Sequence, residues 1–143
     1  MAAAFTAGEG GKATARRAGE LQQRALQLAE VELHAFEPVL EALRLPTDDP
    51  ERANRVKAAQ IEASRSPLEI AGVGAEVAEL AAELARGGNP NLTGDATAGA
   101  LLAAAGAQAA ARLVAINLVE GPAVDEASEL ARRALAARDQ ALV

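Results

Sequence analysis

The chain has 143 residues and a formal net charge of −6, which argues against a protein that binds nucleic acid through a basic face. It contains no cysteine and one histidine, so disulfides, thiolate chemistry and a multi-histidine metal site within one chain are excluded. No signal peptide is visible in the sequence. We therefore expect one domain, residues 1–143, in a soluble cytoplasmic protein.

Alanine makes up much of the apolar content, and only two residues are aromatic. Alanine is the best helix former and a poor filler of cores. The composition predicts an all-α protein with closely packed helices and little burial per residue. A dimer would relieve that deficit. We expect a compact bundle of five to six helices around a central apolar helix.

The first half of the chain reads as three helices. Residues 1–7 are apolar and run into "GEGG", which is typical of a helix end. A second helix extends from about residue 12 or 14 to residue 43. Pro38 removes a backbone donor within it, so we expect a kink near His34 or a break into two helices. A third helix, from about 51 to 64, begins after Asp49 as its cap.

The second half contains the least polar helix. "SPLE" at Ser66–Glu69 fits a capping box and starts a helix that ends at residues 87–88. Its apolar face carries Val73, Val77, Leu80 and Leu84. After the loop "GGNPNLTGDATAG", a helix over about 94–118 is apolar nearly all round, which predicts a central position. Charges at Asp95 and Arg112 favour a buried helix over a membrane span. A last helix covers about 124–141.

Four polar residues precede the central helix: Asn89, Asn91, Thr93 and Asp95. Thr93 or Asp95 can cap the helix, and Asn-Pro makes the turn. A helix N-terminus beside two amides also offers donors and acceptors to a ligand. Both interpretations stay open, since only one residue is needed as the cap.

Other polar groups allow two interpretations each. Glu30 and His34 share a helix face and form either a solvated pair or an acid–base group. Arg112, with Gln108 one turn before it, either reaches the surface or holds a carboxylate from the protein or from a ligand. Asn117 is either a helix-end cap or a site residue. The basic cluster is either ordinary surface or a contact for an anionic tail; it comprises Lys12, Arg16 and Arg17.

Three segments resemble one known family. The stretch "GNPNLTGDATAGALLAAAGAQAAARLVAINL", Gly88–Leu118, is similar to the signature of the cyclodeaminase/cyclohydrolase family. "EVELHAFEPVLEALRLP", Glu30–Pro46, resembles the family's acidic, alanine-phenylalanine and "LP" stretch. "SPLEIA", Ser66–Ala71, resembles its "VPL" segment. The resemblance covers essentially the whole chain in order.

The resemblance implies an all-α homodimer acting on a tetrahydrofolate derivative, with no nucleic-acid or membrane partner. Its members are formiminotetrahydrofolate cyclodeaminases and methenyltetrahydrofolate cyclohydrolases, whose chemistry needs no metal or other cofactor. The resemblance makes Asp95 and Glu32 the acid–base candidates. It makes Asn89, Asn91 and Asn117 groups that orient the pterin. The basic cluster with Lys12 and Arg16 would then meet the glutamate tail.

The chain departs from the family pattern at three places. The 143 residues do not include the family's usual "PGGGS"-like loop. Its paired aspartates are Glu30 and Glu32 here, and an asparagine is replaced by Leu113. These departures keep open an alternative function. The chain would then be a catalytically weak or inactive relative that binds a folate-like ligand or a partner protein.

Overall fold

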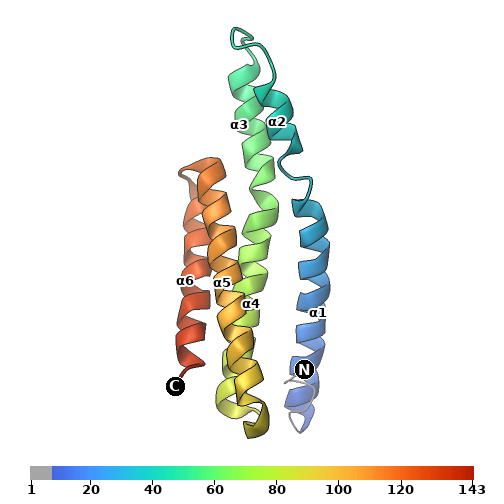
Figure 1. The fold of residues 1–143 in the computed structure, drawn as a ribbon, viewed down its shortest axis with the longest axis vertical. Coiled ribbons are helices and arrows are strands. Elements are labelled where there is room, and N and C mark those ends of the chain that lie inside the picture. The colour runs from blue at the N-terminus through green and yellow to red at the C-terminus, as the bar shows by residue number, and fades with distance from the viewer. Residues whose placement is uncertain (1–7) are drawn as a thin grey trace.

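A computed structural model describes residues 8–143, which form an all-α antiparallel bundle (Figure 1). The helices are α1 (Gly8–Glu32), α2 (Glu37–Leu43), α3 (Arg52–Ala63), α4 (Arg65–Gly87), α5 (Thr93–Leu118) and α6 (Pro122–Gln140). A short 3-10 helix, η2 (Pro90–Leu92), precedes α5. The all-α prediction is confirmed. The helix end predicted at residues 1–7 lies outside the described residues.

Four long helices, α1, α4, α5 and α6, make up most of the bundle within residues 8–143, while α2 and α3 are shorter, so the expected count of five to six bundle helices needs correction. Only Ser64 separates α3 from α4, and the two continue as one rod (Figure 1). Ser64 keeps a helical conformation, and its hydroxyl donates to the Gln60 carbonyl at 2.8 Å. Ser66 therefore lies inside a helix and caps nothing, so the predicted capping box is wrong.

The break predicted near Pro38 is confirmed. Helix α1 ends at Glu32, residues 33–36 form a turn, and Pro38 lies in the first turn of α2, where its missing amide is harmless. The start of α1 was placed too late by the sequence. Residues 8–11, "GEGG", belong to its first turns instead of ending an earlier helix.

The core is built of alanine. Its central cluster contains ten residues, all of them alanines: Ala75, Ala78, Ala81, Ala82, Ala100, Ala104, Ala107, Ala134, Ala137 and Ala141. Helix α4 lies so close to α5 that a Cβ on Gly74 would stand 3.0 Å from the Ala107 Cβ. Larger side chains do not fit between backbones at this separation. The predicted core face with Val73 and Leu80 is accordingly only partly buried.

Helix α5 is not the central helix that the sequence predicted. Helix α4 takes that place, because it packs against α1, α5 and α6. Helix α5 leaves one face open, with Leu102 75% and Ile116 57% exposed. By length and composition, Pro90–Leu118 is also the one stretch within residues 8–143 that would suit a membrane span, with 28% of its most apolar window buried.

Candidate active site

Glu32 is the last residue of α1, and its position depends on a contact far away in sequence. The Ser66 hydroxyl, on α4, donates a hydrogen bond of 2.5 Å to the Glu32 carboxylate. Ser66 is buried, with 4% of its surface exposed, while Glu32 is half-buried. One carboxylate oxygen is thus fixed against α4, which holds the group at the point where α1 gives way to the turn.

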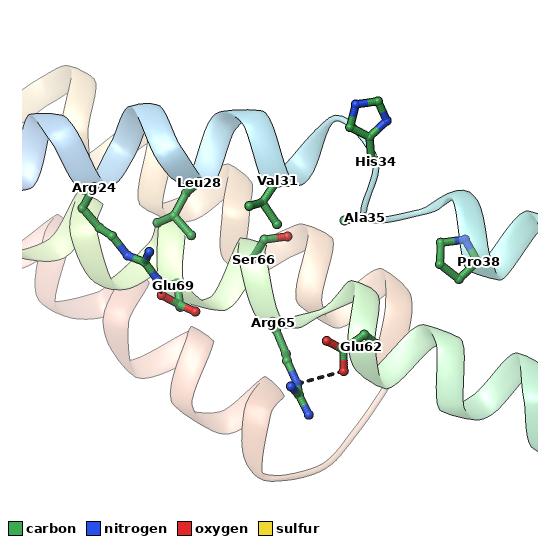
Figure 2. A pocket seen from close by; sticks show the side chains of 10 residues that line it. All are labelled: Arg24, Leu28, Val31, His34, Ala35, Pro38, Glu62, Arg65, Ser66 and Glu69. Atoms are coloured by element: carbon green, nitrogen blue, oxygen red, sulfur yellow. Dashed lines mark hydrogen bonds and ion pairs between the residues drawn. The ribbon is translucent and has the colours of Figure 1, made fainter.

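A cavity of about 570 Å³ lies between α1 and the α3–α4 rod, and Ser66 lines it, whereas Glu32 is not among its lining residues. Leu28 and Val31 reach into it from α1 toward Ser66, as Figure 2 shows. Its charged lining is internally paired: Arg24 with Glu69, and Arg65 with Glu62 at 3.1 Å. The remaining lining residues are His34, Ala35 and Pro38. The volume lies within the range of about 300–1,000 Å³ that small-molecule sites occupy.

His34 lies at the rim of the cavity and does not pair with Glu30. Its Nδ1 stands 2.8 Å from a Glu37 carboxylate oxygen. This hydrogen bond, together with the charge of Glu37, raises the pKa of the His34 imidazole above its ordinary value of 6.5. The side chain is exposed and points away from α4 (Figure 2).

The loop before α5 forms a small structure of its own. The Asn89 side-chain oxygen accepts a hydrogen bond of 3.0 Å from the Asn91 backbone N–H and so caps η2. Thr93 already belongs to α5, and its hydroxyl donates to the Pro90 carbonyl at 3.1 Å. Neither Thr93 nor Asp95 caps α5, so that prediction is wrong. Asp95 is exposed in the first turn of α5, and within residues 8–143 it forms no hydrogen bond or ion pair.

Asn117 lies at the opposite end of α5. Its side-chain amide donates to the Ala63 carbonyl at 3.4 Å, at the junction of α3 and α4. Ala63 precedes Ser66 by three residues, about one helical turn. Asn117 thus belongs to the same end of the bundle as the Glu32–Ser66 pair.

The basic cluster lies near the other end, along the first half of α1. Arg17 pairs with Glu20 at 3.1 Å and with Glu76 on α4. Arg16 stands 3.9 Å from Glu20, and its side chain is 82% exposed. Lys12 is exposed as well. The arginines are therefore partly neutralised by carboxylates of the same chain.

The predicted site residues fall into two groups within one chain. The loop-end group contains Asn89, Asn91 and Asp95, with Lys12 and Arg16 on the neighbouring part of α1. The turn-end group contains Glu32 and Asn117, to which the structure adds Ser66. From Asp95 to Asn117 the α5 helix rises about 33 Å, so one chain does not bring the two groups together.

Nothing in the sequence signals the role of Ser66. Its spacing to Glu69 fits a local cap, and only the antiparallel packing of α1 on α4 reveals Glu32 as its partner. The Arg24–Glu69 and His34–Glu37 pairs were missed for different reasons. The first joins residues 45 positions apart. In the second, Glu37 lies three residues from His34, and the sequence offers Glu30, four residues away, as an equally suitable partner.

A comparison with known protein families shows which family the chain belongs to. The family model described as formiminotransferase-cyclodeaminase matches residues 4–135. The chain belongs to this family. The match covers both groups of predicted site residues, and it confirms the family that the three motif segments indicated. No curated protein matches the chain.

Proposed function

We propose that this family member is a folate one-carbon enzyme, either a methenyltetrahydrofolate cyclohydrolase or a formiminotetrahydrofolate cyclodeaminase. It would work in the cytoplasm as a homodimer, without a metal or other cofactor. Family membership supports the folate substrate. The observation that carries the chemistry is the Glu32 carboxylate, which is held by Ser66, a residue that lines a cavity of about 570 Å³.

A carboxylate held through one oxygen keeps the other oxygen available for proton transfer. In the cyclohydrolase reaction, water adds to the methenyl carbon and gives a proton to a base. A folate nitrogen then leaves the tetrahedral carbon and takes a proton. In the cyclodeaminase reaction, a folate nitrogen adds to the formimino carbon, and ammonia leaves once it is protonated. Glu32 and Asp95 are the two groups proposed for these proton transfers.

The remaining predicted residues would bind the substrate. Asn89 and Asn91 are held in a defined loop by their own hydrogen bond, which presents amide groups beside Asp95. Asn117 would orient the pterin from the turn end. Lys12 and Arg16 are exposed cations that would attract the anionic glutamate tail.

A spectrophotometric assay with purified protein tests the proposal and separates the two reactions. A cyclohydrolase removes the absorbance of methenyltetrahydrofolate, whereas a cyclodeaminase given formiminotetrahydrofolate produces it. Glu32→Gln should lower the rate by about 10²–10⁴, the usual contribution of a general acid or base. Glu83→Gln makes the same chemical change at an exposed carboxylate of α4 and should leave the rate unchanged. A rate equal to buffer with both folates would exclude the enzyme.

The alternative, a folate-binding or protein-interaction module, gains support from the separation of Glu32 and Asp95 within one chain. Titration calorimetry distinguishes it from the enzyme. A binding module would take up the folate with a measurable heat and leave its absorbance unchanged over hours.

A further inference from the structure

The junction of α3 and α4 contains a proline at a position where a continuous helix needs a backbone donor. Only Ser64 separates the two helices, and Pro67 lies in the first turn of α4. In an unbroken helix, the carbonyl of Ala63 would accept a hydrogen bond from the N–H of residue 67. Pro67 has no N–H, and its ring crowds the carbonyl four residues before it. The sequence therefore deprives the Ala63 carbonyl of its usual partner within the rod.

The side chain of Asn117 supplies the donor that Pro67 lacks. Its amide nitrogen reaches across from α5 and donates to the Ala63 carbonyl at 3.4 Å. Ala63 is 3% exposed and the Pro67 side chain is fully buried, so this point of the rod is largely shielded from solvent. A buried carbonyl without a donor is costly. The bond from Asn117 therefore compensates for the break that Pro67 introduces.

Asn117 does not cap its own helix, which was the other use the sequence allowed for it. Helix α5 ends through the backbone N–H of Val119, which donates to the Ala115 carbonyl. The Asn117 side chain bonds outward to a different helix instead. Its structural task thus belongs to the α3–α4 junction.

Three segments that are distant in the sequence meet at this junction. Ser66, about one turn after Ala63, donates to the Glu32 carboxylate at the end of α1. Asn117 ties the same turn to the end of α5. Glu32, Ser66 and Asn117 each come from a different one of the three segments that resemble the family. A shift of this turn would move Ser66, and with it the carboxylate oxygen that Ser66 holds.

We propose that Asn117 and Pro67 are positioning residues, which fix this turn of the rod and, through Ser66, the Glu32 carboxylate. Pro67 frees the Ala63 carbonyl, and Asn117 fastens that carbonyl to α5. Asn117 uses its nitrogen for this task, so it acts on the reaction through Glu32 even where its oxygen faces the pterin. The effect on turnover rests on the function proposed above, whereas the link between Asn117 and Pro67 does not.

A double-mutant cycle tests the link, because Pro67→Ala restores a backbone N–H at residue 67. The Ala63 carbonyl then has a partner inside the rod, and the amide of Asn117 becomes dispensable. Asn117→Ala should raise the unfolding equilibrium constant at least about fivefold more in the wild-type background than in Pro67→Ala. Changes in helix propensity and side-chain packing at Asn117 are common to both backgrounds and cancel. Urea unfolding followed by circular dichroism measures all four proteins at one concentration.

Pro38→Ala is the matched control for this cycle. Pro38 also lies in the first turn of a helix, but the carbonyl four residues before it, that of His34, already accepts the Glu37 N–H at 3.1 Å. Asn117→Ala should therefore cost the same with and without Pro38→Ala. An equal cost of Asn117→Ala in the wild-type and Pro67→Ala backgrounds would overturn the proposal.

Asn117→Asp tests the same bond without altering Pro67. It keeps the size of the side chain and replaces the donating nitrogen with an oxygen that the Ala63 carbonyl repels. The unfolding equilibrium constant should rise by about fivefold or more. Asn54→Asp makes the same chemical change at an exposed position of α3 and should change the constant by less than about twofold. Equal effects of the two substitutions would also count against the link.

Kinetics separate positioning from direct contact with the substrate once wild type turns over a folate. Asn117→Ala should lower kcat by about 10²-fold, the scale expected for a reacting group displaced by about 1 Å, and leave KM nearly unchanged. The loss should largely disappear in the Pro67→Ala background. A loss of the same size in both backgrounds, or one confined to KM, would assign Asn117 to substrate contact and refute the positioning role. If wild type turns over neither folate, the proposed function fails, while the unfolding cycle still decides the link.

Discussion

Gly74 lies where α4 packs closely on α5, and replacing it tests the alanine core directly. A Cβ at this position would lie 3.0 Å from the Ala107 Cβ and 3.1 Å from both the Ala103 carbonyl oxygen and the Ala107 nitrogen. Two of these three atoms belong to the α5 backbone and cannot rotate away. Gly19, in the middle of α1, is the matched control, because a Cβ added there would have nothing within 4 Å.

The two Gly→Ala variants share one energy term and differ in the other. Both gain about 1 kcal/mol of helix propensity. Only Gly74→Ala overpacks the core, at a cost of about 1–3 kcal/mol. The propensity gain cancels in the comparison, so Gly74→Ala should be less stable than Gly19→Ala by about 1–3 kcal/mol.

Urea unfolding followed by far-ultraviolet circular dichroism measures this difference, with all proteins at one concentration. Gly19→Ala should exceed wild type in its free energy of unfolding. Equal stabilisation by both substitutions would show that α4 and α5 are farther apart than this packing requires, and it would refute the argument for a core that admits only alanine.

Three further substitutions test local features. Val119 has a φ of 64° and is 80% exposed, so Val119→Gly should raise the free energy of unfolding by about 1 kcal/mol; a lower value would contradict the strain. Proton NMR of the single imidazole should give His34 a pKa above 6.5, and Glu37→Gln should lower it. Because the folded pKa is raised, this contact stabilises the protein below pH 6.5 and is lost as the pH rises through the raised pKa. Arg52 donates two hydrogen bonds of 3.2 Å to carbonyls at and just beyond the end of α2, so Arg52→Ala should speed amide exchange in α2 and leave α6 unchanged.

The sequence predicted best what depends on neighbouring residues. Glycines 87 and 88 end α4, and Pro38 marks the break after α1, because both act on the backbone where they stand. The burial of side chains was predicted less well. Hydropathy assigns Leu80 and Val73 to the core, yet helix separation decides which residues fit, and alanine fits where leucine does not.

The arrangement of the candidate site was predicted from the sequence even less completely than the burial of side chains. The family motifs include the loop and the acidic stretch, but they carry no distances. Ser66 satisfies a local capping pattern and is used instead to hold Glu32, a residue 34 positions away. Asp95 and Glu32 were predicted to share one site, yet within one chain they lie at opposite ends of the bundle. That separation depends on the length of α5 and on the packing of α1 along α4, neither of which a motif encodes.

The hairpin of α2 and α3 extends beyond the turn that joins α5 to α6 (Figure 1). Helix α2 packs chiefly on α3, so most of its contacts can be lost while the alanine core of α4, α5 and α6 stays intact. We therefore expect two levels of cooperativity within residues 8–143. The hairpin can open as a separate unit at a lower free energy than global unfolding, and it would be the first region to exchange its amides or to be cut by a protease. Such opening would loosen the turn beside Glu32, so we expect access to the cavity to depend on the stability of this hairpin.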